Sequence, residues 1–331
     1  MDNYRRKDSF TGPFTGGGIE TERFNKLYDQ GRKPDLKTGM RLYLVVFLLL
    51  LVIGSVVQGL NLEIGMIITQ WVLILLPALW ILNRYRVDRV TFVRIRPLKF
   101  RFIPVIILLS ASFWVLNMII AAGMVSGLME LGYEPIVVLE PPQTFQHYLV
   151  YLFVISISAG ICEEILFRGT IMPAMEDHGL VPAIVFSSLL FALFHISFLN
   201  LISTFMIGAV IAVVVIKTGS LWGGIFYHML NNLFAITYLY FAGQQETATE
   251  VDPHAYWIAL PLLILALAGA YSGLKLLQKH ADVKPLLKDR AAGWLPRGWF
   301  NGILVIALFL FLLMAMIELV VGFGWFGLDV L

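Results

Sequence analysis

Long apolar runs separated by short polar segments dominate this chain. A helix that crosses a bilayer needs about 20 mostly apolar residues, and nine runs reach or approach that length. Their apolar residues are continuous rather than alternating, which favours membrane helices over the strands of a barrel. The pattern predicts an all-α, polytopic transmembrane bundle with nine spans, at Leu42–Leu60, Ile64–Leu82, Phe102–Leu131, Tyr148–Phe167, Pro182–Phe198, Leu199–Ile216, Leu221–Ala242, Ala255–Leu274 and Gly302–Phe323.

The composition supports this class. Apolar types make up 59% of the 331 residues and charged types 14%, whereas a soluble domain has about 45–50% and 25%. The net charge of +2 gives no bulk attraction to phosphate, so nucleic-acid binding is not expected. The single cysteine, Cys162, has no partner for an intrachain disulfide.

The distribution of basic residues predicts the orientation. Residues 1–40 contain eight Lys and Arg, residues 83–101 seven and residues 275–299 six, whereas residues 132–147 and 243–254 contain none and carry acids. Because basic loops stay in the cytoplasm, nine spans with a cytoplasmic N-terminus place all three basic segments inside. No cleavable signal peptide is recognisable, so the first span is expected to act as an uncleaved anchor, most naturally in the cytoplasmic membrane.

This arrangement suggests four parts of the chain. Residues 1–40 form a polar cytosolic tail, and residues 41–144 hold three accessory transmembrane helices. Residues 145–242 form a four-helix core that contains the candidate chemistry described next. Residues 243–331 add two C-terminal transmembrane helices joined by a basic cytosolic loop.

Ionisable and strongly polar groups gather in spans four to seven. A charged side chain at membrane depth costs about 2.5–3.5 kcal/mol on insertion scales, so each is a functional candidate. Three further acids, Glu63, Glu130 and Glu318, lie near span ends and are interpreted as interfacial groups close to water. The candidates within the four spans are Glu163, Glu164, Arg168, His195, His228 and Asn232.

The two adjacent glutamates have different expected surroundings. Glu164 and Arg168 are four residues apart with the acid first, which is the favoured order for a helical ion pair. Glu163 lies about 100° around the helix from Glu164 and has no cation four residues away. A buried carboxylate without a partner has a raised pKa and can take a proton from water, as a general base must.

The imidazoles repeat the four-residue spacing. Phe191 precedes His195 by four, so its ring can pack against that imidazole, and His228 precedes Asn232 by four. Taken alone, either histidine could simply be a hydrogen-bond partner between two helices, with no catalytic role. Amide hydrolysis, however, needs a base, an activated water and donors for the developing oxyanion, and this set can supply all three.

The three motifs together resemble a known family. Glu163-Glu164-Ile-Leu-Phe-Arg168 matches E-E-x-x-x-R, Phe191-Ala-Leu-Phe-His195 matches F-x-x-x-H, and His228-Met-Leu-Asn-Asn232 matches H-x-x-x-N. In this order they resemble the CPBP family, which includes type II CAAX prenyl endopeptidases and bacteriocin-processing enzymes. The resemblance covers roughly residues 145–242.

The resemblance implies an intramembrane endopeptidase acting on a peptide or lipidated protein. Glu163 would activate water held by His195, His228 and Asn232 would hold the oxyanion, and Glu164 and Arg168 would support Glu163. A zinc site built from Glu163, His195 and His228 is the alternative. Because the base would then be the paired Glu164, metal-free glutamate chemistry is favoured.

The depths of these residues make a structural prediction. Glu163 and His195 can meet only if helix four continues inward past Arg168 to about His178. Gly179 and Pro182 would then end it and begin helix five, and Pro173 can kink the extension.

Other functions remain open. The chain could be a non-proteolytic scaffold or a bacteriocin-immunity-like protein, or a proton-coupled transporter that uses buried Glu and His. No H-E-x-x-H motif and no aspartate within a span occur, which argues against two other classes of membrane protease. Cys162 is interpreted as a small packing residue rather than a reactive thiol. Neither the physiological substrate nor the oligomeric state can be predicted.

Overall fold

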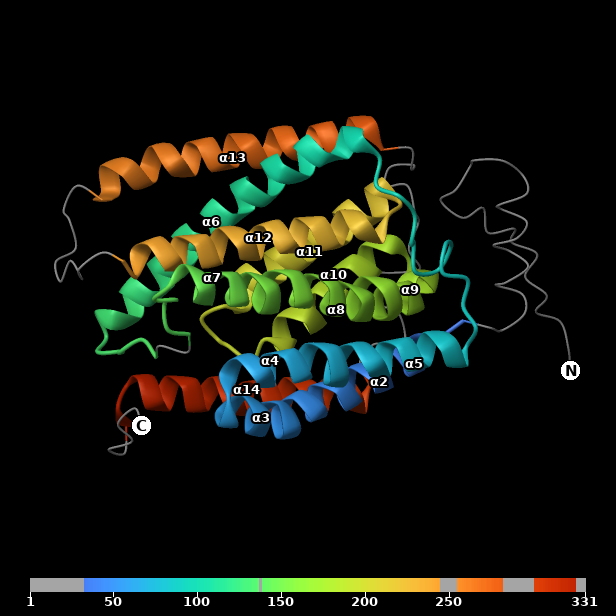
Figure 1. The fold of residues 1–331 in the computed structure, drawn as a ribbon, viewed down its shortest axis with the longest axis horizontal. Coiled ribbons are helices and arrows are strands. Elements are labelled where there is room, and N and C mark those ends of the chain that lie inside the picture. The colour runs from blue at the N-terminus through green and yellow to red at the C-terminus, as the bar shows by residue number, and fades with distance from the viewer. Residues whose placement is uncertain (1–32, 137–138, 245–254, 282–300, 326–331) are drawn as a thin grey trace, which may run out of the picture.

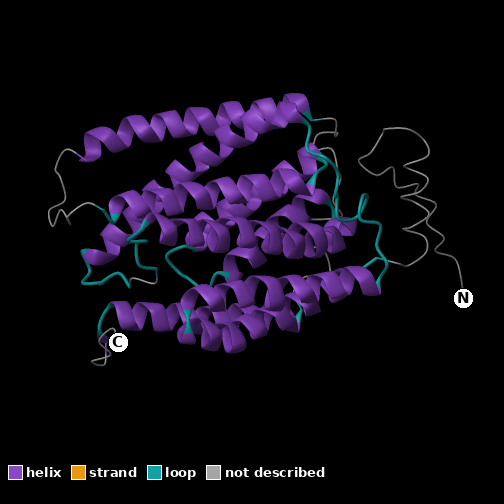
Figure 2. Cartoon of the chain, viewed as in Figure 1, coloured by secondary structure: helices purple, strands orange, loops and turns teal. Residues whose placement is uncertain are grey.

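The computed structural model describes residues 33–136, 139–244, 255–281 and 301–325. In these ranges the regular secondary structure is helical throughout, as predicted (Figure 2). Most of the predicted cytosolic tail and most of the predicted basic loop at 275–299 lie outside the described residues. The α-helices are α2 (Leu36–Leu49), α3 (Ser55–Leu60), α4 (Leu62–Ile68), α5 (Leu76–Arg84), α6 (Ile103–Met129), α7 (Phe145–Tyr151), α8 (Ala159–Leu166), α9 (Met172–Met175), α10 (Leu180–Phe194), α11 (Leu201–Thr218), α12 (Leu221–Ala242), α13 (Ala255–His280) and α14 (Gly302–Gly322).

Within the described ranges, seven helical stretches are long and apolar enough to cross a membrane, which makes the chain an integral multi-pass membrane protein. Several combine consecutive α-helices with a π-helical turn between them, such as Leu50–Gly54 or Thr69–Leu75. The seven are Leu36–Leu60, Leu62–Arg84, Phe100–Met129, Phe145–His178, Leu201–Thr218, Ile258–His280 and Gly302–Gly322.

Two of the nine predicted spans are not among these seven. The predicted span Pro182–Phe198 is wrong at its C-terminal end, because α10 stops at Phe194 after 15 residues. α12 is long enough to span a membrane, with 22 residues. However, His228 and two consecutive asparagines lower its mean hydropathy, so it is not among the seven. The count of nine and the cytoplasmic N-terminus therefore stay predictions.

The predicted long fourth helix is confirmed. α7, α8 and α9 join through short π-helical segments into one helical stretch from Phe145 to His178. Gly179 then adopts φ +114°, a conformation that side-chain-bearing residues rarely take, and the chain turns directly into α10. Pro173 stands in the first turn of α9, immediately after the π-helical segment Phe167–Ile171.

The helices stack in layers around this long stretch (Figure 1). α12 lies between α6 and α8, and α10 packs on α11. The α2–α5 hairpin lies against the opposite side of α8, with the segment Thr69–Leu75 as its main contact. α13 runs along α6 at one edge of the bundle, and α14 packs against α2 and α10 at the other.

An aromatic cluster joins the α2–α5 hairpin, called the N-terminal hairpin from here on, to the centre of the bundle. Phe194 of α10 packs against Tyr43, Phe47 and Phe167, with ring centroids 5.3–6.3 Å apart. Phe167 also meets Phe191 edge to face at 5.1 Å. These buried rings fix the C-terminal turn of α10, which ends at Phe194, directly before His195.

Candidate active site

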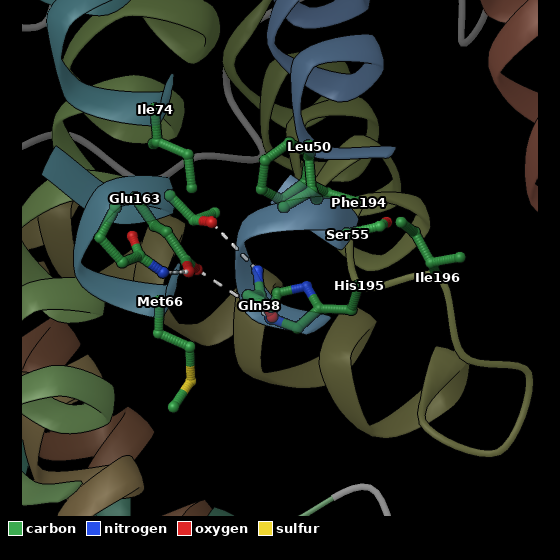
Figure 3. Close-up of a pocket in the computed structure, with 11 residues that line it drawn as sticks. Leu50, Ser55, Gln58, Met66, Ile74, Glu163, Phe194, His195 and Ile196 are labelled. Carbon is green, nitrogen blue, oxygen red and sulfur yellow. Dashed lines mark hydrogen bonds and ion pairs between the residues drawn. The ribbon is translucent and has the colours of Figure 1, made fainter. Parts of the chain in front are cut away.

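Glu163 lies at the centre of the candidate site. Its side chain projects from α8, and the residue is 6% exposed. Oε1 accepts a hydrogen bond from Nε2 of Gln70 at 2.8 Å. Oε2 is buried, makes no hydrogen bond to the described residues and stands 4.0 Å from Nε2 of His195 (Figure 3).

The backbone around His195 sets its orientation. The residue caps the C-terminus of α10, and the following Ile196 takes φ +54°, which turns the chain away from the helix axis. Nδ1 of His195 lies 2.8 Å from the carbonyl oxygen of Phe191, so Nδ1 carries the proton and donates. In the neutral imidazole Nε2 is then an acceptor that faces Glu163.

Two acceptors therefore face each other across 4.0 Å. That separation is too long for a direct hydrogen bond, and neither an ionised carboxylate nor the lone pair of Nε2 can donate to the other. A water molecule that gives one proton to each would satisfy both. The pair can thus share one bridging water.

Glu163 and His195 line a cavity of about 290 Å³ whose other walls come largely from the N-terminal hairpin. Gln58, which also lines it, donates to the hydroxyl of Thr69 at 3.0 Å. The lining mixes amide and hydroxyl groups with aliphatic side chains, so it can accept a polar backbone beside apolar substituents (Figure 3). The lining residues are Leu50, Ser55, Gln58, Met66, Thr69, Gln70, Ile74, Glu163, Phe194, His195 and Ile196.

Glu164 belongs to a separate, fully buried network. Its Oε1 accepts from Nη1 of Arg168 at 3.0 Å, which confirms the predicted ion pair, and from Nδ1 of His228 at 2.9 Å. Nη2 of Arg168 donates to the carbonyl of Gly208 on α11 at 2.8 Å. The network ties α8, α11 and α12 together, and it fixes the orientation of the His228 ring.

Phe191 separates the two imidazoles. Its ring lies 4.7 Å from His195 and 5.8 Å from His228, both edge to face, so the predicted packing against His195 is confirmed. The guanidinium carbon of Arg168 stands 4.4 Å from the centre of the same ring. Phe191 therefore connects the water-facing pair to the buried network.

Asn232 has partners of its own. Its Nδ2 donates to the carbonyl of Ile155 at 2.9 Å, and its Oδ1 accepts from Asn231 at 3.4 Å. Neither Asn232 nor His228 lines the cavity at Glu163. The structure thus brings Glu163 to His195 and Glu164 to His228, and the role of Asn232 and His228 as oxyanion donors stays a prediction.

The zinc alternative stays a prediction, as does the metal-free chemistry. The bonds to Glu164 and Gln70 use Nδ1 of His228 and Oε1 of Glu163, and they do not engage Nε2 or Oε2. Across the described parts of the chain, no three side chains of His, Cys, Asp or Glu converge in a way that could hold a metal ion.

Two residues at this site, Gln70 and Gln58, were not among the sequence-based candidates, and a third beside it, Glu318, was expected only at a span end. Gln70 and Gln58 are amides inside apolar runs, a signal of the same kind as Asn232. Glu318 of α14 accepts from the hydroxyl of Ser197 at 3.0 Å and from the backbone N–H of Phe198 at 2.6 Å. Its interpretation as an interfacial acid close to water does not account for these two bonds, which hold the loop after His195.

Cys162 is a small packing residue, as the sequence predicts. Its thiol is fully buried in the core cluster of apolar side chains, although it adjoins Glu163 in the chain. It therefore contributes packing to α8 and takes no part in the cavity.

The fold and the site define a multi-pass membrane protein with a buried acid–imidazole pair. One family model, described as type II CAAX prenyl endopeptidase Rce1-like, matches residues 145–234. That segment is similar to the CPBP family, as its motifs indicated, and it contains Glu163, Glu164, Arg168, His195, His228 and Asn232. At the level of the family, the match supports a CAAX-type intramembrane protease. Comparisons with curated proteins and with solved structures gave no match.

Proposed function

We infer that this chain is an intramembrane endopeptidase in which Glu163 and His195 activate the attacking water. The observation that carries this function is the 4.0 Å gap between Oε2 of Glu163 and Nε2 of His195 inside a cavity. A water in that gap donates to both groups. Gln70 holds the carboxylate in place through its second oxygen.

The reaction can be written with this chain's own groups. Oε2 of Glu163 takes one proton from the water as the water oxygen attacks the carbonyl carbon of the scissile bond. The resulting tetrahedral oxyanion needs hydrogen-bond donors. The protonated Glu163 then gives its proton to the leaving amine as the C–N bond breaks, which returns the carboxylate to its starting state.

His228 and Asn232 are the proposed oxyanion donors. His228 is held by Glu164, and a protonated imidazole could donate through Nε2. For Asn232 the assignment requires its amide to exchange the carbonyl of Ile155 for the substrate oxygen. Substrate that binds between α8 and α12 would have to break the hydrogen bond from Asn232 to Ile155.

The proposed substrate is a membrane-associated or lipidated peptide of the CAAX type. The family supports this class, and the lining of the cavity can accept an extended peptide with apolar side chains. The proposed location is the cytoplasmic membrane with a cytoplasmic N-terminus, because that orientation places the basic segments inside.

The test uses pure full-length protein in proteoliposomes with matched C-terminal peptides, prenylated and unprenylated. We expect an endoproteolytic product, identified by mass spectrometry, that disappears in Glu163→Ala and His195→Ala while both variants remain folded. Measurement of bound metal, and of cleavage with and without chelator, tests the metal-free chemistry. Cleavage that persists in Glu163→Ala would reject the assigned role, and a scaffold would cleave none of the peptides.

A further inference from the structure

A second cavity lies at the other end of the N-terminal hairpin, between the start of α2 and the end of α5. Its volume is about 480 Å³, and it shares no lining residue with the cavity at Glu163. All of its lining residues precede the family-matched segment 145–234. It is therefore a feature that the proposed proteolysis does not require.

The polar part of this cavity is cationic. Arg41 comes from α2 and Arg84 from the last turn of α5, and both side chains are exposed to the cavity mouth. No carboxylate among the described residues is within ion-pair distance of either guanidinium. Two unpaired guanidiniums in one cavity form a site for an anion with several oxygens, such as a phosphate.

A short chain of hydrogen bonds fixes the shape of this polar end. The hydroxyl of Thr38 donates to Oδ1 of Asp35 at 2.6 Å, so the hydroxyl of Tyr85, 2.9 Å away, must donate to Thr38. This link joins the first turn of α2 to the C-terminus of α5. Because Asp35 also caps α2 by accepting from the backbone of Thr38, its charge is already engaged by two donors.

The rest of the cavity is apolar and opens sideways. Val45 and Trp80 are 52% and 65% exposed, although they belong to stretches long and apolar enough to span a membrane. In a membrane such exposed faces meet lipid, and a tryptophan near a helix end is typical of the level of the headgroups. A phosphate site that continues into a lipid-facing apolar groove has the chemistry of a phospholipid.

We propose that this cavity binds one phospholipid with an anionic headgroup. Arg41 and Arg84 hold the phosphate, and the acyl chains lie along Val45 and Trp80. Basic pockets between transmembrane helices on the cytoplasmic side bind anionic lipid headgroups by this chemistry. The other six Lys and Arg of segment 83–101 add attraction to the same leaflet.

The first test measures lipid binding to the full-length protein in neutral detergent by native mass spectrometry. The probes are dihexanoyl phosphatidylglycerol, dihexanoyl phosphatidylcholine and free glycerol 3-phosphate. At about 1 kcal/mol per basic residue, Arg41→Gln/Arg84→Gln is expected to weaken phosphatidylglycerol binding by about thirtyfold. Arg89→Gln, which removes an exposed guanidinium of the same segment outside the cavity, is the matched control and should bind as the unmodified chain does.

A second test follows the acyl chains and leaves the charges intact, which covers the case of a double variant that does not fold. In nanodiscs, phosphatidylglycerol with brominated chains should quench tryptophan fluorescence less in Trp80→Phe than in the unmodified chain. Equal quenching in the two proteins would overturn the proposal. So would equal binding of phosphatidylcholine, equal binding of glycerol 3-phosphate, or an equal loss in Arg89→Gln.

Discussion

At the scale of single residues, two adjacent carboxylates have opposite surroundings. Glu164 is fully buried and accepts from Arg168 and His228, so its charge is balanced and its position fixed. Glu163, one residue earlier, points into a cavity with one amide donor and an imidazole 4.0 Å away. The rotation of about 100° per helical residue separates a structural acid from an acid that can meet water.

The buried pair makes a prediction about stability. Arg168→Ala leaves the carboxylate of Glu164 in the core without its main cation, which should lower the free energy of unfolding by about 3–5 kcal/mol. Thermal unfolding in detergent measures the change, and Arg89→Ala, on the surface, should stay within about 0.5 kcal/mol. Adding Glu164→Gln to Arg168→Ala should recover part of the loss. Equal stability of Arg168→Ala and the unmodified chain would contradict the account.

The amide beside Glu163 makes a prediction about rate. Hydrogen bonds to charged groups contribute about 1.5–3 kcal/mol, so Gln70→Ala should reduce kcat/KM by about tenfold to hundredfold. Gln58→Ala is the matched control, because Gln58 lines the same cavity but donates to Thr69 instead. Similar losses in the two variants would show that the contact with Glu163 is unimportant.

At the scale of elements, the end of α10 determines where the imidazole lies. Packing of Phe194 on Tyr43, Phe47 and Phe167 fixes the last turn, and the chain leaves the helix at His195. The loop that follows is bonded to Glu318 of α14. A helix outside the family-matched segment therefore helps to position a proposed catalytic group.

Glu318→Ala is expected to release this loop and lower kcat by about tenfold to hundredfold with little change in KM, because two hydrogen bonds to a carboxylate are lost. Glu318→Gln keeps one acceptor oxygen and should recover part of the rate. Glu130→Gln, an exposed acid at the end of α6, is the control. A change confined to thermal stability, with kcat unaltered, would make Glu318 purely structural.

The sequence predicted more of the elements than of their contacts. Spacing predicted the Glu164–Arg168 pair, the packing of Phe191 against His195 and the extension of helix four to His178, because each depends on local helical geometry or on depth. The end of α10 at Phe194 and the contacts of Gln70 and Glu318 depend on packing between distant segments. One sequence alone contains no record of which helices become neighbours.

At the scale of the whole molecule, the candidate site is shared between two parts of the chain. Residues 145–234 match the family and supply Glu163 and His195, but much of the cavity wall comes from residues 50–74. The lipid cavity proposed above lies in the same N-terminal hairpin. The hairpin therefore forms much of the wall of the candidate site.

Splitting the chain into two fragments tests whether both parts are needed to form the site. Fragments 1–134 and 135–331, separated between two exposed loop residues, should associate when co-expressed and recover cleavage. Fragment 135–331 alone should cleave at least about tenfold more slowly, since it lacks Gln70 and the cavity wall. Co-purification and the peptide assay measure both effects. Full activity of fragment 135–331 alone would contradict the role of the hairpin.

The most direct measurement compares Glu163→Gln with the unmodified chain in a single-turnover cleavage assay in proteoliposomes, using a prenylated peptide that the unmodified chain cleaves. Gln keeps the size of the side chain and can still bond to Gln70, but it cannot take a proton from water. A positioned general base contributes about 10²- to 10⁴-fold, so the rate of bond cleavage should fall by that factor at unchanged thermal stability. A rate close to that of the unmodified chain would contradict the central claim that Glu163 activates the water.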